Sequence, residues 1–218
     1  MNEHTIVYFG YGSLVNRDTR PPDEPAARAR LRGWHRIWEH RVSASASRQP
    51  SCSLSIAPDW IRTEVDVPAG CEPGLHDGTS RGIDGVVVPL PIEALAVLDA
   101  REEGYERLTL PATEFDLPAG LDVEEIHVYR SLLENRVSAT DEHPILQTYV
   151  DCCMAGFLNV YGECGLDNFL HATRGWGGQI ENDRTQPRYP RAVAIPGDML
   201  ARFDRLVNAR REGCLLNQ

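Results

Sequence analysis

Most apolar positions in the first 130 residues fall in short runs rich in β-branched and aromatic residues. These runs are bounded by glycine, proline or charged residues, a pattern typical of β-strands. The predicted strands are Thr5–Phe9, Leu31–Trp38, Cys52–Ala57, Ile83–Leu90, Arg107–Phe115 and Glu125–Tyr129.

Apolar residues at helical spacing occur mostly in the second half of the chain. The first predicted helix begins at Pro91 and ends at Gly104, since proline suits the first helical position and glycine ends a helix. A second helix begins at Pro144 and is apolar nearly all round, so we expect it to be buried. A third starts at Asp198 as N-cap and stops at Gly213.

Strands that come first and helices that come mostly last, without regular alternation, indicate an α+β fold rather than a doubly wound sheet. The length of 218 residues suits one domain, so we expect a single domain over residues 1–218. Residues 20–30 and 66–82 are predicted loops. Residues 175–218 form a C-terminal extension whose role the sequence does not define, and the GWGG loop with the ENDRTQPRYPR stretch after it is predicted either to cap a pocket or to be a surface connection.

The composition narrows the class of partner. Hydrophobic residues make up 42% and charged residues 25%, as in a folded globular protein. The net charge of -10 argues against a general binder of nucleic acids or anionic membranes, which needs a basic face. No apolar run reaches the length of a membrane span and no secretory signal is evident, so we expect a cytoplasmic protein with reduced thiols. The sequence specifies no oligomeric state.

Metal and thiol chemistry find little support. There is no CxxC pair and no HExxH spacing, and His35, Glu39 and His40 are interpreted as strand residues of which His40 points away from the other two. The Cys152-Cys153 pair is interpreted as small core side chains. A local cluster of Cys71, His76 and Asp77 is left as a weak alternative.

The stretch IVYFGYGSLV is the most informative part of the chain. A predicted strand runs directly into Gly10 and Gly12, and glycines let a backbone turn sharply and approach a ligand closely. Free N–H groups in such a turn can hold a carboxylate or a developing oxyanion. Neither a dinucleotide fingerprint nor a nucleophile elbow fits, because Tyr11 and Val15 stand where those motifs need glycine.

A second informative stretch, LDAREEGYERL, places Glu102 and Glu103 at the end of the first predicted helix. The negative end of the helix dipole disfavours the charged form of a carboxylate there. A carboxyl group that exchanges its proton near neutral pH is what general acid–base catalysis requires. A solvated helix end with Arg101 offsetting the acids is the alternative reading of the doublet taken alone.

Together these two stretches resemble the signatures of the γ-glutamylcyclotransferase superfamily. The first signature is a hydrophobic strand followed by YGS(L/N), here Tyr11-Gly12-Ser13-Leu14. The second is a helix ending in LDxxE with Gly and Tyr shortly after, here Leu98–Glu102 followed by Gly104 and Tyr105. Residues 30–38 look like the second-strand region of the ChaC-type, glutathione-degrading branch. Residues 82–90 look like the family's strand before the catalytic helix, and Pro144–Tyr149 resembles a later helix of the family.

The resemblance implies a small mixed β-barrel with flanking helices and a cofactor-independent enzyme. In the family, the free α-amine of a small γ-glutamyl compound attacks its own γ-amide carbonyl, which releases 5-oxoproline. By position in the motifs, Glu102 is the general acid/base, while Tyr11, Gly12, Ser13, Leu14, Tyr105 and Tyr149 bind substrate. The substrate is then a γ-glutamyl amino acid or glutathione, and no metal is implied.

The sequence leaves three alternatives open. The turn between the predicted acid and the Gly-Tyr pair is short, so Glu103 rivals Glu102 and the choice of substrate is in doubt. A non-catalytic module that binds a γ-glutamyl or amino-acid-like ligand, and a γ-glutamylamine cyclotransferase, are the alternative functions. Arg41 and Arg48 follow the second strand and are candidates for a distal carboxylate of a peptide substrate.

Overall fold

The computed structural model describes residues 5–44, 49–59 and 82–215, and it contains two mixed β-sheets and three α-helices. The first sheet has six strands in the order β6 (Tyr105–Pro111), β8 (Glu125–Ser131), β1 (Thr5–Gly10), β5 (Gly82–Pro91), β2 (Ala27–Arg32) and β7 (Phe115–Asp116). The second has five strands in the order β10 (Thr173–Arg174), β3 (Trp34–Val42), β4 (Ser51–Pro58), β9 (Ile145–Leu146) and β11 (Ile180–Glu181).

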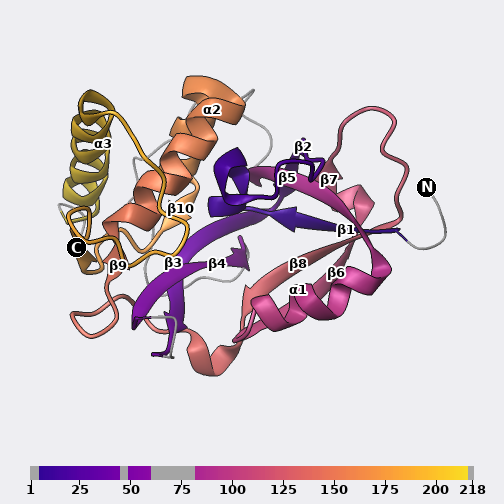
Figure 1. The fold of residues 1–218 in the computed structure, drawn as a ribbon, viewed down its shortest axis with the longest axis horizontal. Helices are drawn as coiled ribbons and strands as arrows, with labels where there is room; N and C mark the ends of the chain where they lie inside the picture. The colour runs from indigo at the N-terminus through magenta and orange to yellow at the C-terminus, as the bar shows by residue number, and fades with distance from the viewer. Residues whose placement is uncertain (1–4, 45–48, 60–81, 216–218) are drawn as a thin grey trace.

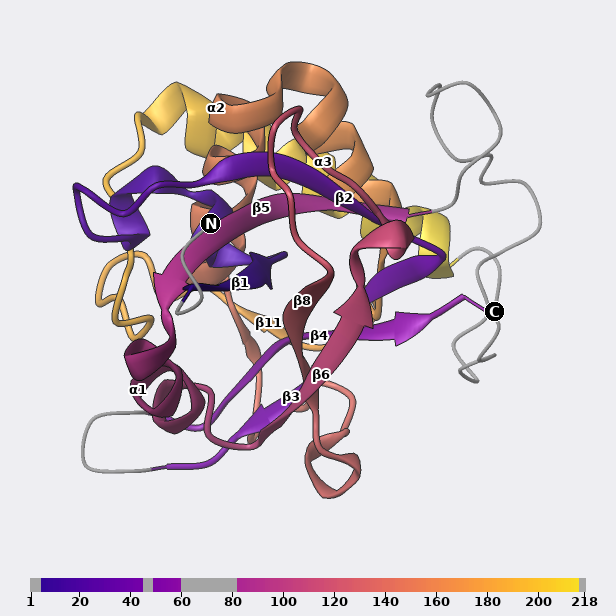
Figure 2. The ribbon, with the colours of Figure 1, turned by 90° about the vertical axis from the view of Figure 1, so that its right-hand side faces the viewer.

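The sheets curl around a common interior, and β2 and β5 are visibly curved in Figure 2. β1 lies in the middle of the first sheet, antiparallel to β5 and parallel to β8. The two sheets are joined where the backbone N–H of Ser131 on β8 donates to Ser55 Oγ on β4, at 3.1 Å. This arrangement confirms the predicted α+β class.

The helices flank the sheets. α2 (Gln147–His171) and α3 (Gly197–Leu215) pack side by side on one side of the molecule, and α1 (Leu95–Arg101) lies apart from them beside β6 and β8 (Figure 1). Short 3-10 helices occupy the connections η1 (Ser13–Val15), η2 (Arg17–Thr19), η3 (Ile92–Ala94), η4 (Ala112–Glu114) and η5 (Leu133–Asn135). No helix in the described ranges has both the length and the apolar character needed to cross a bilayer.

One hydrophobic core runs through both sheets and the two long helices. Phe157 of α2 and Phe203 of α3 are completely buried in it, as is Trp176 in the loop after β10. Burying a side chain of this size contributes about 1.5–3 kcal/mol. The expected burial of the second helix is confirmed, since most of its first half is buried. The single-domain assignment and the boundary at residue 175 stay predictions.

Two strand predictions needed correction. The strand expected over Leu31–Trp38 is two strands, because Gly33 adopts φ 74° and carries the chain from the first sheet into the second. The first of these strands, β2, begins at Ala27, within residues that were predicted to form a loop. The strand expected over Arg107–Phe115 starts earlier, at Tyr105, and is interrupted by η4.

The helix boundaries also differ from prediction. The first helical segment starts as η3 after Pro91, and α1 proper begins at Leu95. α2 begins at Gln147 rather than Pro144, because the Pro144 carbonyl accepts the Cys52 N–H at 2.9 Å and the next two residues pair as β9. Tertiary strand pairing thus overrides the local proline signal. α3 continues through Gly213 to Leu215.

Candidate active site

The loop after β1 places a row of backbone amides at the end of a buried strand. The Val15 N–H donates to the Gly12 carbonyl at 3.0 Å and thereby forms η1. Within the described part of the chain, the amides of Gly12, Ser13 and Leu14 find no hydrogen-bond acceptor. These three N–H groups are therefore available to a ligand.

Gly12 has little room for a side chain. A Cβ at this position would lie 3.0 Å from the hydroxyl oxygen of Tyr149 and 3.4 Å from Cδ1 of Leu54. Because the first contact is tighter than most Cβ contacts, the Tyr149 hydroxyl would have to give by a few tenths of an ångström. The absence of a side chain at Gly12 lets the loop lie directly against the start of α2.

The loop is held from inside the core by a buried arginine. Arg36 on β3 is completely buried, and its Nε donates to the Tyr11 carbonyl at 2.7 Å. Its Nη2 donates to the Asp84 carbonyl, and its Cζ lies 4.5 Å from the centre of the Phe157 ring. Because a trans peptide is planar, fixing the Tyr11 carbonyl directs the Gly12 N–H to the opposite side.

α2 supports the same loop from a second direction. Asn16 Nδ2 donates to the Cys152 carbonyl at 3.0 Å. A Cβ at Gly156 would lie only 2.6 Å from the Asn16 nitrogen, so the helix backbone and the loop are in direct contact. Cys152 and Cys153 are buried thiols without a disulfide bond, and burial raises the pKa of Cys152 to about 12. They pack as small core side chains, as the sequence indicated.

The end of α1 presents the two predicted acids at a tight turn. Glu102 directly follows the last helical residue, and its carbonyl accepts the Tyr105 N–H at 3.0 Å. Gly104 closes this turn with φ 88°. A Cβ there would lie 3.0 Å from both His40 Cε1 and Asn135 Nδ2, so glycine meets a conformational and a steric requirement.

The Glu102 side chain is partly buried, with 21% of its surface exposed. Its Oε1 accepts a hydrogen bond from Arg101 Nε at 3.0 Å, while its Oε2 has no donor among the described residues. Burial and then the negative charge of Glu102 raise the pKa of Tyr11 well above its usual value. Glu102 and Tyr11–Leu14, which we call the glycine loop, line the same cavity.

These two segments open onto one cavity of about 410 Å³, a volume typical of small-molecule sites. The cavity wall includes every residue that the motifs had singled out: Tyr11, Gly12, Ser13, Leu14, Glu102, Tyr105 and Tyr149. Glu103 also lines it. The structure therefore brings the two motifs together, although they are about ninety residues apart in the sequence.

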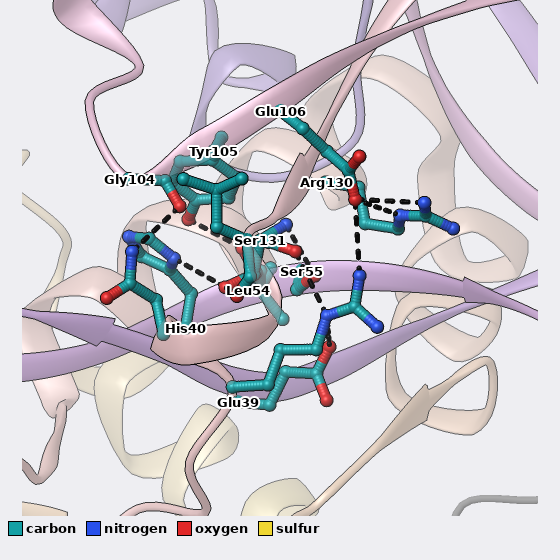
Figure 3. Close-up of polar contacts among 12 residues, drawn as sticks. Glu39, His40, Leu54, Ser55, Gly104, Tyr105, Glu106, Arg130 and Ser131 are labelled. Carbon is teal, nitrogen blue, oxygen red and sulfur yellow. Dashed lines mark hydrogen bonds and ion pairs between the residues drawn. The ribbon is translucent and has the colours of Figure 1, made fainter.

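His40 is a wall residue that the sequence did not predict. Its ring stacks on Tyr105 with centroids 3.7 Å apart, and its Nδ1 lies 2.9 Å from Ser131 Oγ (Figure 3). The Tyr105 hydroxyl donates to the Leu54 carbonyl at 2.8 Å. A bulge between Trp38 and His40 shifts the register of β3 and changes the direction that simple alternation predicts for His40.

The C-terminal extension supplies another part of the wall. Arg188, Tyr189, Pro190 and Arg191 all line the cavity. The Tyr189 hydroxyl donates to Ser13 Oγ at 2.6 Å, and its ring centre lies 4.8 Å from that of Tyr149. Burial raises the pKa of Tyr189 to about 12, so the hydroxyl keeps its proton at neutral pH. Of the two readings of this stretch, the structure favours the one in which it covers a pocket.

Two anchors hold this segment in place. Asp183 accepts the Thr148 N–H at 2.9 Å and the Thr148 hydroxyl at 2.6 Å, and so caps the start of α2. The same carboxylate accepts the Arg188 N–H at 2.9 Å. Arg184 pairs with Asp151 on α2 and Asp204 on α3, each at 2.7 Å. The segment before α3 is thus tied to both long helices (Figure 1).

Two arginines and one local cluster remain from the sequence predictions. Arg41 is not part of the cavity wall, and its Nη2 donates to the Glu134 carbonyl at 3.4 Å. Arg48, the 66–81 part of the predicted loop, and the cluster of Cys71, His76 and Asp77 lie outside the described residues. Across residues 5–44, 49–59 and 82–215 there is no group of three or more His, Cys, Asp or Glu residues that could hold a metal ion.

No known family model matches the sequence, and no curated protein matches it. Solved structures do match. A protein named gamma-glutamyl cyclotransferase superposes with a TM-score of 0.52 at 15% identity, covering 92% of this chain and 99% of that chain. An uncharacterized protein from Homo sapiens superposes with a TM-score of 0.53 at 16% identity, covering 94% of this chain and 99% of its own. Both matches span nearly the whole of each chain, and they confirm the resemblance at the level of the fold: the chain has the γ-glutamylcyclotransferase-like fold.

Proposed function

We propose that this protein is a γ-glutamylcyclotransferase that releases 5-oxoproline from a small γ-glutamyl compound, either a γ-glutamyl amino acid or glutathione. The observation that carries the proposal is the convergence of the Gly12–Leu14 amides and the Glu102 carboxylate on one cavity. The shared fold is consistent with this reaction class but does not by itself identify the substrate.

In the proposed first step, Glu102 removes a proton from the α-ammonium group of the substrate. The freed amine attacks the γ-carbonyl carbon, so a C–N bond forms and the carbonyl π electrons move to oxygen. We assign the amides of Gly12, Ser13 and Leu14, which have no acceptor among the described residues, to donate hydrogen bonds to that oxyanion. Arg36 contributes indirectly, because it fixes the peptide that carries the Gly12 N–H.

In the second step the oxyanion collapses and the bond to the leaving nitrogen breaks. Glu102 passes its proton to that nitrogen, and the regained carboxylate then takes the second proton from the ring nitrogen, which leaves 5-oxoproline with a neutral amide. This second proton departs on the released amine as its ammonium form, so no other reactant is consumed. One carboxyl group can serve as base and then as acid, because both nitrogens that exchange protons belong to the same bound substrate.

The aromatic wall is assigned to orienting the substrate. Tyr105 is held by His40 and by the Leu54 carbonyl, and Tyr149 is packed between Gly12 and Tyr189. Rigid side chains in these places favour a folded γ-glutamyl chain in which the amine lies near its own carbonyl. Orientation of this kind contributes substantially to intramolecular reactions.

The test is to incubate the purified protein with glutathione, γ-glutamyl dipeptides and γ-glutamylamines, and to measure 5-oxoproline by mass spectrometry. Turnover of γ-glutamylamines alone identifies the amine-specific alternative. Saturable binding without any product identifies a binding module and contradicts the proposed enzyme.

Glu102→Gln tests the assignment of the acid. We expect kcat to fall about 10²–10⁴-fold while the fold is retained, because the amide cannot accept and return a proton. Glu103→Gln is the matched control on the same turn, and its kcat should stay within about threefold of wild type. The reverse pattern would show that Glu103 is the proton carrier.

A further inference from the structure

The charged residues of the cavity wall divide into paired and unpaired groups. Among the described residues, three arginines and two glutamates line it: Arg101, Arg188, Arg191, Glu102 and Glu103. Arg101 pairs with Glu102, and Arg188 pairs with Glu181 outside the wall. Within the described residues, Arg191 has no carboxylate in ion-pair distance.

The contacts of Arg191 fix its position without neutralising it. Its Nε donates to the Tyr189 hydroxyl oxygen at 3.1 Å, and its Nη2 approaches Ser13 Oγ at 3.5 Å. Both partners are hydroxyl groups. Its Nη1 has no acceptor in the described ranges, so the guanidinium keeps hydrogens to donate.

Arg191 also lies beside the glycine loop, since Ser13 is both its neighbour and part of that loop. A half-buried guanidinium of this kind is suited to an anion that enters the cavity. Every γ-glutamyl compound carries an α-carboxylate, and γ-glutamyl amino acids and peptides carry a second carboxylate on the leaving group.

We infer that Arg191 is a substrate-binding residue that pairs with a carboxylate of the γ-glutamyl substrate, and that the Arg188–Arg191 stretch is an integral part of the site. This inference rests on the proposed function for the identity of the ligand. It gives the C-terminal extension a role in choosing substrates. Anchoring by Asp183 and Arg184 keeps Arg191 in place before substrate arrives.

The experiment measures binding without turnover, in the Glu102→Gln background. A γ-glutamyl dipeptide and a γ-glutamylamine are titrated calorimetrically into Glu102→Gln protein with Arg191 intact or changed to Met or Lys. Arg205→Met, an exposed change on α3 outside the cavity wall, is the control.

We expect Arg191→Met to weaken dipeptide binding about 10- to 100-fold, as expected for loss of a charge-assisted hydrogen bond, and Arg191→Lys to recover part of it. If γ-glutamylamine binding is weakened equally, the partner is the α-carboxylate. If γ-glutamylamine binding is unchanged, the partner is the carboxylate of the leaving group. Both outcomes support the inference.

Dipeptide affinity within twofold of the parent in Arg191→Met overturns it, as does failure of the dipeptide to bind the Glu102→Gln parent. In the otherwise wild-type enzyme, Arg191→Met should raise KM with little change in kcat. A fall in kcat with unchanged KM would instead assign Arg191 to the transition state. Failure of the proposed function is a separate result, namely no 5-oxoproline from wild-type protein.

Discussion

Two arginines contact the glycine loop, and they lie in opposite environments. Arg36 lies in the core, where two backbone carbonyls and the faces of Phe157 and Phe169 surround its guanidinium. Arg191 lies on the cavity wall, where two hydroxyl groups touch it. Burial lowers the pKa of Arg36 to about 10, so it remains charged at neutral pH.

The difference shows that the role of a guanidinium group depends on which groups accept its hydrogen bonds. Removing Arg36 leaves buried carbonyls without donors, which costs stability. Removing Arg191 leaves the Tyr189 hydroxyl still bonded to Ser13 Oγ, so its loss should mainly affect ligand binding. We therefore assign Arg36 to holding the loop in position and Arg191 to binding the substrate.

The largest effect should come from Arg36→Leu. We expect the free energy of unfolding to fall by about 2–5 kcal/mol, because the Tyr11 and Asp84 carbonyls lose their donors. Arg191→Leu should lower it by about 1 kcal/mol or less. Denaturant unfolding of both variants measures the contrast, and equal losses would show that the two arginines are not functionally distinct.

The next effect should come from Gly12→Ala, which alters the loop between the two arginines. The new Cβ would press on the Tyr149 hydroxyl and shift the amides. We expect kcat/KM for 5-oxoproline release to fall about tenfold or more, within the range for loss of oxyanion stabilisation. Gly197→Ala, where the added Cβ meets no atom within 4 Å, is the control. Equal activity in the two variants would exclude tight packing at Gly12 as a requirement.

The smallest effect should be on the pH dependence of the free energy of unfolding, through Asp183, which anchors the segment that carries Arg191. Burial opposes ionisation of Asp183, but hydrogen bonds from Thr148 and Arg188 outweigh it and lower the pKa of that carboxyl. A lowered pKa in the folded state stabilises the protein above the unfolded value of about 4, and this stabilisation is lost as the pH falls through the folded value.

The free energy of unfolding of wild-type protein, measured from pH 7 to pH 3, should therefore decline more steeply below about pH 4 than that of Asp183→Asn. Asp141→Asn, a change at an exposed residue, should retain the wild-type slope. An unchanged slope in Asp183→Asn would mean that Asp183 does not anchor the segment that carries Arg191.

The parts of the site that lie in short continuous motifs were predictable. Tyr11–Leu14 follows a strand, and Glu102 ends a helix, and both features depend on residues close in sequence. His40 was not predictable in the same way. Its direction depends on a bulge in β3, which arises from pairing with β4 rather than from any local residue pattern.

The strand errors have the same origin. The sequence shows Gly33 inside an apolar run, but only the assembled sheets require the chain to change sheet there. The predicted start of α2 was wrong for a related reason: the Pro144 carbonyl accepts a hydrogen bond from Cys52 on β4, so the helix begins later. Local signals identified the type of element in these regions, and long-range pairing set the boundaries.

By itself, the sequence determined the α+β class, the buried second helix, the glycine loop and the helix-end acid, since short-range spacing and backbone chemistry specify these features. Only the tertiary structure decided that the loop and Glu102 share a cavity, that His40 faces it, and that Arg191 completes its wall. The physical reason is that a cavity is formed by segments far apart in the chain. Their convergence depends on how two curved sheets and α2 pack, which no local pattern encodes.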